Sequence, residues 1–163
     1  MIELRVLTPD GWRTWRRLRL AALAEAPYAF GSRLADWQGH GDREERWRAR
    51  LGIPGSFNVV AVLDGEPAGL ASGVPADGAA ELISMWVSPA ARGHGVGDRL
   101  VQAVARWARQ AGSEVLRLAV AQGNENAAGL YRRNGFQLTG ELGDPMPDGR
   151  RERIMAKDLS TRA

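Results

Sequence analysis

Residues 92–97 read RGHGVG and separate two runs of different pattern. The run ELISMWV (81–87) before them is typical of a strand, and VGDRLVQAVARWARQAG (96–112) has the apolar spacing of a helix. Glycine weakens a helix interior, so glycines at a helix entrance need another reason. The first N–H groups of a helix have no partner inside it and lie at the positive end of its dipole. This order of strand, glycine loop and helix predicts a phosphate-binding site.

Two common phosphate-binding loops do not fit this stretch. A Walker A loop ends in Gly-Lys-Ser/Thr, whereas Gly97 is followed by Asp98-Arg99. A dinucleotide-binding loop reads G-x-G-x-x-G after the first strand, whereas G-x-G-x-G stands here late in the chain. On these residues alone, a glycine-rich turn without a ligand remains an open alternative.

Length and composition limit the classes of protein to consider. The chain has 163 residues, and we expect a single domain over residues 1–163. Its pI is about 10.1, but its formal charge is only +3, which gives no support to nucleic-acid binding. The absence of cysteine excludes disulfides and thiol catalysis, and two histidines without paired spacing predict no metal site. No secretion signal or membrane-spanning run is present, so we expect a cytoplasmic location. We also expect a monomer or a homodimer.

The remaining patterns predict a mixed α/β sheet with the order β-α-α-β-β-β-α-β-α-β-β. The apolar residues of the first helix recur on one side, so its arginines are expected to form a solvated face; the alternative is that some of them border an acidic acceptor. A tight turn at Asp64-Gly65 joins two strands, and residues 143–149 form a loop. Expected strands are 2–7, 56–63, 66–74, 80–87, 114–120, 136–142 and 151–159, and expected helices are 9–25, 42–51, 96–111 and 124–135.

Two linked motifs resemble those of the Gcn5-related N-acetyltransferases, the GNAT family. VSPAARGHGVGDRL (87–100) is similar to the acetyl-CoA-binding motif Arg/Gln-x-x-Gly-x-Gly/Ala, with Arg92, Gly95 and Gly97 at its defined positions. NENAAGLYRRNGF (124–136) is similar to the second family motif. Its matching residues are Asn124, Ala127, Leu130, Tyr131, Gly135 and Phe136. The resemblance is strong from about Leu82 to Phe136 and implies a splayed central sheet flanked by helices and acetyl transfer from acetyl-CoA.

The resemblance also implies how coenzyme A binds. Its pyrophosphate would accept hydrogen bonds from the N–H groups of residues 93–97, where a Cβ would hold the anion off. Its pantetheine arm would pair with the strand ending near Val87, which splays from the strand 114–120. A backbone N–H of Trp86 or Val87 would polarise the thioester carbonyl. The implied cofactor-binding residues are Met85, Trp86, Val87, Arg92, Gly93, His94, Gly95, Val96, Gly97, Asn124, Ala127 and Tyr131.

Two residues are candidates for catalysis through the same resemblance. Tyr131 matches the family tyrosine that protonates the departing thiolate, although it is also suited to a core position. Glu81 lies where several family members carry the acid that removes the amine proton, although a solvated strand-end glutamate is the alternative. Asn124 would contact the cofactor arm, and a role as helix N-cap is compatible with that contact.

The acceptor is expected between residues 26–41 and 143–151. Tyr28 and Phe30 would form an aromatic wall, and Asp144 and Asp148 would attract an amine. The sequence does not distinguish protein amines from small-molecule amines. The leading function is an N-acetyltransferase acting on a primary amine; the alternative is a non-catalytic module that senses acetyl-CoA. An RNA-associated protein is a third class, which the modest net charge does not support.

Overall fold

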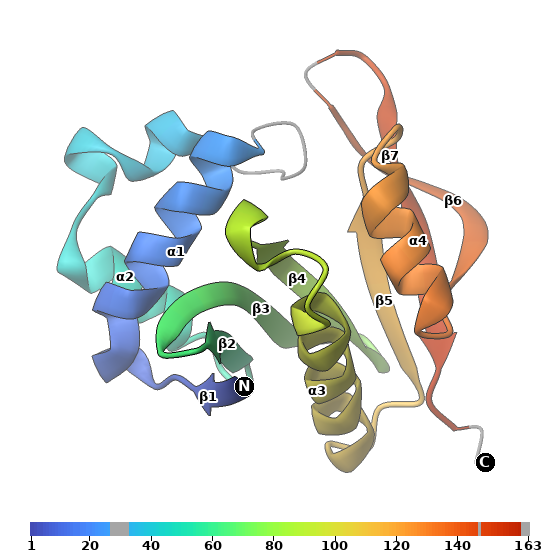
Figure 1. Ribbon diagram of the computed structural model, residues 1–163. Helices are drawn as coiled ribbons and strands as arrows, with labels where there is room; N and C mark the ends of the chain where they lie inside the picture. Colours follow the sequence, from blue (N-terminus) through green and yellow to red (C-terminus); the bar gives the residue numbers. More distant parts are fainter. Residues whose placement is uncertain (27–32, 147, 161–163) are drawn as a thin grey trace.

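The computed structural model describes residues 1–26, 33–146 and 148–160. Within these ranges, one seven-stranded sheet has the order β1-β2-β3-β4-β5-β7-β6 (Figure 1). Neighbouring strands are antiparallel except β4 and β5, which are parallel. The strands are β1 (Ile2–Val6), β2 (Phe57–Leu63), β3 (Glu66–Ala76), β4 (Ala79–Val87), β5 (Val115–Val120), β6 (Gln137–Pro145) and β7 (Arg151–Asp158). The predicted mixed α/β class and element order are confirmed.

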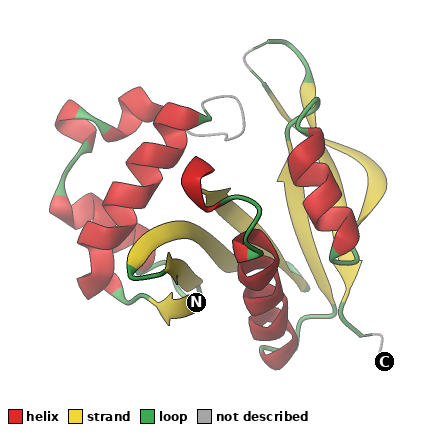
Figure 2. Cartoon of the chain, viewed as in Figure 1, coloured by secondary structure: helices red, strands yellow, loops and turns green. Residues whose placement is uncertain are grey.

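The helices form two groups on the two faces of this sheet (Figure 2). One group is α1 (Trp12–Glu25) with α2 (Glu44–Leu51), and the other is α3 (Val96–Gln110) with α4 (Glu125–Arg133). Short 3₁₀ helices lie at Pro9–Gly11, Leu34–Trp37, Gly39–Gly41 and Pro89–Ala91. No helix in the described ranges has the length and apolar character needed to cross a membrane.

Alternation along the strands explains the two layers of core. In β2, Val59 packs in the cluster under α3, whereas Val60 packs in the cluster under α1 and α2. Successive side chains of a strand point to opposite faces, so a strand covered on both sides is apolar throughout. The predicted turn after β2 is present, and Asp64 and Gly65 both have positive φ, +50° and +86°.

The expected solvated face of α1 was wrong for Arg19. Arg19 is only 8% exposed. Arg16 forms a two-bond ion pair with Asp42, with bonds of 2.7 and 2.6 Å. The side chain of Asp42 also accepts a 2.8 Å hydrogen bond from Trp47 Nε1 of α2. Helical periodicity cannot show that α2 and the segment before it pack against this side of α1.

Strand β6 is longer than expected and extends to Pro145. The predicted loop 143–149 is therefore shorter, and Asp144 belongs to the strand. This difference matters for the site, because β6 and β7 pair as a hairpin with Pro145 opposite Arg151. The hairpin holds Asp144 and Glu152 near its turn.

Candidate active site

The sheet opens between β4 and β5. The two strands pair only at Ala80 with Leu116 and at Glu81 with Arg117. Strand β4 continues unpaired on this side to Val87, and β5 continues to Val120. The splay implied by the family resemblance is therefore present, and it leaves an unpaired edge of β4 facing the opening.

Strand β4 also contains a bulge that the sequence pattern did not predict. Its register with β3 shifts between the pairs Leu70–Trp86 and Ser72–Ile83, which places one extra residue on β4. Ser84, within the shifted stretch, has a φ of +56°, which is rare for a residue with a side chain. Bulges change the direction of side chains and are common beside functional sites.

A cavity of about 670 Å³ lies beside the opening and the glycine loop. We call it the loop cavity. Its wall contains every implied cofactor-binding residue except His94, which is exposed and lies outside it. The wall is formed by Glu25, Ala26, Met85, Trp86, Val87, Ala91, Arg92, Gly93, Gly95, Val96, Gly97, Asp98, Asn124, Asn126, Ala127, Leu130, Tyr131 and Arg133.

The glycine loop presents bare main chain to this cavity. Among the described residues, none of the N–H groups of residues 93–97 donates a hydrogen bond to a main-chain oxygen, whereas the N–H of Arg99 donates to Gly95 O at 3.2 Å. Gly95 is the N-cap of α3 and has a φ of +83°. A Cβ at Gly95 would meet no atom within 4 Å, so backbone conformation explains this glycine better than crowding. Free N–H groups at a helix start fit a pyrophosphate.

Packing explains the last glycine of the loop. A Cβ at Gly97 would lie 3.1 Å from Leu130 Cδ2 and 3.6 Å from Met85 Cε. The close approach of α3 to α4 therefore depends on the absence of a side chain. Room for Leu130 is therefore one reason for a glycine here, and the expected room for the ligand stays a prediction.

Arg92 is anchored beside the loop and forms an ion pair with Glu25 at the end of α1. Arg92 Nε also donates to Val87 O at 3.1 Å. Glu25 accepts a 3.0 Å hydrogen bond from Trp86 Nε1, and this bond, followed by the interaction with Arg92, lowers the pKa of Glu25. The three residues tie α1 and the loop to the end of β4.

Asn124 and Gly135 bound α4 as the motif predicts. Asn124 Oδ1 accepts a 3.3 Å hydrogen bond from the N–H of Ala127, so Asn124 caps the helix and also faces the loop cavity. Gly135 follows the helix end with a φ of +93°.

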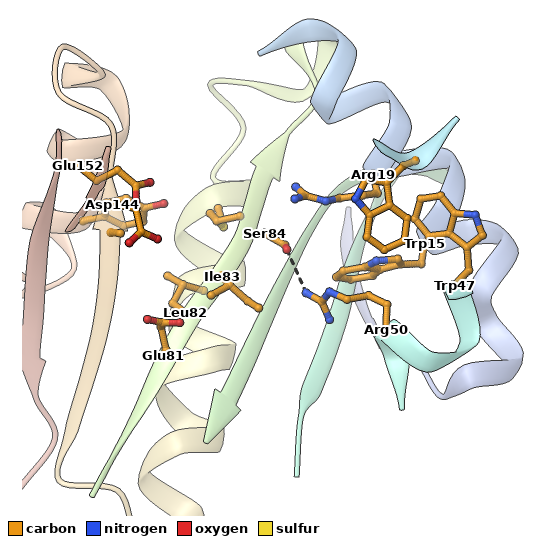
Figure 3. A pocket seen from close by; sticks show the side chains of 14 residues that line it. Trp15, Arg19, Trp47, Arg50, Glu81, Leu82, Ile83, Ser84, Asp144 and Glu152 are labelled. Atoms are coloured by element: carbon orange, nitrogen blue, oxygen red, sulfur yellow. Dashed lines mark hydrogen bonds between the residues drawn. The ribbon is translucent and has the colours of Figure 1, made fainter. Parts of the chain in front are cut away.

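A second cavity, of about 310 Å³, lies beside β4 where α1 and α2 cover the sheet (Figure 3). We call it the arginine pocket. Arg19 of α1 and Arg50 of α2 lie on one side, and Glu81, Asp144 and Glu152 lie on the other. The lining residues are Trp15, Arg19, Trp37, Trp47, Arg50, Glu81, Leu82, Ile83, Ser84, Met85, Ala119, Tyr131, Asp144 and Glu152.

The three carboxylates of the arginine pocket influence one another. Partial loss of hydration raises the pKa of Glu81, and the charge of Asp144 raises it further. Burial raises the pKa of Glu152 as well, with a further contribution from Asp144. This side of the pocket therefore favours a proton or a cation.

Met85 and Tyr131 line both cavities. Tyr131 is 7% exposed and packs edge-on against Phe136, with ring centroids 5.8 Å apart. Burial raises the pKa of its phenol well above the ordinary value near 10, so Tyr131 stays protonated at neutral pH. A protonated tyrosine side chain therefore borders both cavities.

Asp148 was also expected at the acceptor, but the structure does not bring it to this pocket. Asp148 instead forms an ion pair with Arg150 at 2.7 Å. Tyr28 and Phe30 lie outside the described residues. Sequence reasoning missed Arg19, Arg50 and Glu152; the one available signal was the four-residue spacing that places Arg19 on the same side of α1 as Trp15.

A splayed mixed sheet with a glycine loop beside its opening is the fold of the GNAT acetyltransferases. Residues 16–136 match the acetyltransferase (GNAT) family, and the chain belongs to this family.

Among characterised relatives, the L-methionine sulfoximine/L-methionine sulfone acetyltransferase of Pseudomonas aeruginosa is 39% identical over 59 residues, 36% of this chain. The matched stretch spans about a third of that relative, 34% of its length.

Solved structures share the fold over nearly the whole chain. The PaiA N-acetyltransferase of Thermoplasma acidophilum, solved with coenzyme A, has a TM-score of 0.76 at 18% identity, covering 97% of this chain and 99% of its own. The acetyltransferase YncA of Salmonella typhimurium, solved with acetyl-CoA, has a TM-score of 0.76 at 21% identity, covering 100% and 96%. Nourseothricin acetyltransferase is 32% identical over 65% of this chain and 66% of its own, with a TM-score of 0.60.

Proposed function

We propose that this protein is an N-acetyltransferase that moves an acetyl group from acetyl-CoA to a primary amine. The observation that carries the proposal is that Met85 and Tyr131 line both the loop cavity and the arginine pocket. A donor in the first cavity and an acceptor in the second would therefore meet at these two residues. Membership of the acetyltransferase family supports the same reaction class.

The loop cavity is the proposed acetyl-CoA site. The free N–H groups of residues 93–97 would bind the pyrophosphate. The open edge of β4 at Met85, Trp86 and Val87 would pair with the pantetheine arm as an added strand does. Asn124 and Ala127 would border that arm from α4. When bound, acetyl-CoA supplies the acetyl group as a thioester.

Tyr131 is the proposed acid and Glu81 the proposed base. In the reaction the acceptor nitrogen bonds to the acetyl carbon, the carbon–sulfur bond breaks, one proton leaves nitrogen and one reaches sulfur. A buried, protonated Tyr131 suits the second transfer. The raised pKa of Glu81 suits the first, because a base with a pKa nearer neutrality accepts a proton more readily.

We also propose that residues 1–163 form one domain. The sheet supports this, because β1 from the start of the chain and β7 from its end belong to the same sheet. The cytoplasmic location and the choice between monomer and homodimer stay predictions.

The test has two stages on the whole chain. Thermal unfolding is first followed with acetyl-CoA and with ADP, and we expect acetyl-CoA to raise Tm more, since ligand stabilisation follows concentration over Kd. Thiol release is then measured with a panel of amines, including L-methionine sulfone because of the Pseudomonas relative. An unchanged Tm would overturn the cofactor site. A raised Tm without thiol release for any amine would favour the non-catalytic binding module.

A further inference from the structure

We infer that the arginine pocket selects a small acceptor of α-amino-acid type, with its carboxylate against Arg50 and Arg19 and its amino group toward Glu81, Asp144 and Glu152. The inference rests on the proposed function, because it names the acceptor class of the same site. It differs from the general family activity, which requires only an amine.

Arg50 is held in the pocket wall by neutral partners. Its guanidinium donates to Asn58 Oδ1 at 3.2 Å, to Ser72 Oγ at 3.1 Å and to Ser84 Oγ at 3.0 Å. It also lies over the Trp15 ring, 5.2 Å from the ring centroid. No acidic side chain in the described ranges pairs with Arg50. These contacts orient the positive charge without neutralising it.

Arg19 brings a second positive charge to the same wall. The pKa of each guanidinium group is lowered to about 10, by burial for Arg50 and by burial together with the charge of Arg50 for Arg19. Both groups stay protonated at neutral pH, so two partly buried like charges lie close together. A carboxylate bound between them would reduce this repulsion and accept charge-assisted hydrogen bonds.

The opposite wall has the reverse charge. Glu81, Asp144 and Glu152 come from β4, β6 and β7 (Figure 3). Burial raises the pKa of Glu81 and Glu152, and the charge of Asp144 raises both further. An ammonium group would relieve this repulsion. The amino group would then lie on the side of the pocket that contains the proposed base. A pocket with cations on one wall and anions on the other matches a zwitterion in one orientation.

Size and apolar surface narrow the acceptor class. A volume of about 310 Å³ suits a small molecule. The pocket is lined by three tryptophans, Trp15, Trp37 and Trp47. The ring centroids of Trp37 and Trp47 lie 4.5 Å apart. The Nε1 atom of Trp15 is a buried donor without an acceptor among the described residues. Trp15 and Trp47 are fully buried, so the half-buried Trp37 ring is the one that would give the acceptor side chain an apolar surface.

The decisive experiment uses the unaltered protein and matched ligands. Each standard L-amino acid and L-methionine sulfone is compared with its carboxamide, which keeps the amine and side chain but loses the negative charge. Binding is measured by calorimetry with coenzyme A present, and kcat/KM by thiol release from acetyl-CoA. We expect at least one acid to bind and react about 10- to 100-fold better than its amide. Amides equal to or better than all acids, or no binding by any acid, would overturn the inference.

Failure of the proposed function has a different signature. Loss of the acetyl-CoA response or of all turnover would count against the enzyme, while acid-over-amide selectivity in the binding measurement would still support the pocket. Turnover of amides or simple amines without that selectivity would support the enzyme and overturn the pocket.

Two substitutions of Arg50 test whether this residue determines the preference for acids over amides. Arg50→Gln is expected to reduce the acid-to-amide ratio in kcat/KM toward one, and Arg50→Lys to retain part of it. Arg48→Gln is the matched control, because Arg48 is on the same helix but pairs with Asp10 and Glu44 outside the pocket. Circular dichroism checks folding; should Arg50→Gln not fold, the ratio for Arg50→Lys and the ligand comparison remain. An unchanged ratio in folded Arg50→Gln would overturn the assignment.

Discussion

Arg50 Nη2 donates a hydrogen bond of 3.0 Å to Ser84 Oγ, the residue with positive φ in the bulge of β4. The extra residue reverses the alternation of the strand. Leu82 packs on the side of α3, whereas Trp86, also at an even position, packs on the side of α1 and α2. Met85 then points to the α3 side, where it reaches the loop cavity. This hydrogen bond therefore joins the wall of the arginine pocket to the bulge that orients Met85.

Two substitutions of Ser84 should separate backbone strain from the lost hydroxyl. Ser84→Ala and Ser84→Gly both remove the hydrogen bond to Arg50, but only glycine adopts a φ of +56° without penalty. We expect the glycine variant to be more stable than the alanine variant by about 1 kcal/mol. Urea unfolding measures the difference, and equal stabilities would show that Ser84 does not hold this backbone conformation.

Gly95→Ala should weaken acetyl-CoA binding about tenfold or more, because alanine disfavours a φ of +83° and the N–H groups that follow would turn away. Gly112→Ala is a matched control. Gly112 has a φ of +88° just beyond the C-terminal end of the same helix, and a Cβ there also meets nothing within 4 Å. Both variants should lose about 1 kcal/mol of stability. Calorimetric titration should show weakened affinity only for Gly95→Ala; equal affinities would place the pyrophosphate elsewhere.

Tyr131→Phe keeps the ring against Phe136 and removes only the hydroxyl. We expect turnover to fall by about 10²-fold or more while affinity for acetyl-CoA hardly changes. Steady-state kinetics and calorimetry give the two values. Full kcat at every pH would assign proton transfer to solvent and leave Tyr131 a packing role.

The pH dependence of kcat/KM tests Glu81. A base must be deprotonated to act, and the pKa of Glu81 is raised, so activity should fall with acid at a pH above the ordinary glutamate pKa near 4.3. Glu81→Gln should lower the rate and abolish this acidic limb. Asp144→Asn should keep the limb but move it to lower pH, because the charge of Asp144 contributes to the raised pKa of Glu81. An unchanged profile in Glu81→Gln would exclude Glu81 as the base.

Asp42 should stabilise the helices that carry Arg19 and Arg50. Hydrogen bonds from Arg16 and Trp47 lower the pKa of Asp42 to about 2, below the unfolded value near 3.9. A lowered pKa contributes stability that is present above the unfolded value and lost as pH falls through the folded one. Asp42→Asn should therefore cost about 1 kcal/mol at pH 7 and progressively less between pH ~4 and ~2.

Asp36→Asn is the control for this prediction, since Asp36 pairs with Arg33 only at 3.8 Å on the surface and should matter little. Thermal unfolding across pH checks both variants. A deficit in Asp42→Asn that stays constant down to pH ~2 would contradict the prediction.

The sequence predicted those parts of the molecule that depend on neighbouring residues. Periodicity identified α3, and the family resemblance named 11 of the 18 residues that line the loop cavity, because those residues lie within or beside two short motifs. The bulge in β4 was not predicted, because one extra residue does not change the pattern of the apolar run ELISMWV. The arginine pocket was not predicted, because Arg19, Arg50 and Glu152 come from three elements that are distant in the sequence and belong to no common motif.

The two cavities draw on different parts of the chain. Apart from Glu25 and Ala26, the loop cavity is built from residues between Met85 and Arg133. The charged residues of the arginine pocket come from the first 50 residues and from the hairpin after Gly143, with Glu81 as the exception. Mutations can therefore accumulate at both ends of the chain while the middle stays under selection for one ligand. Such a chain can diversify in what it modifies over evolutionary time without rebuilding the proposed acetyl-CoA site.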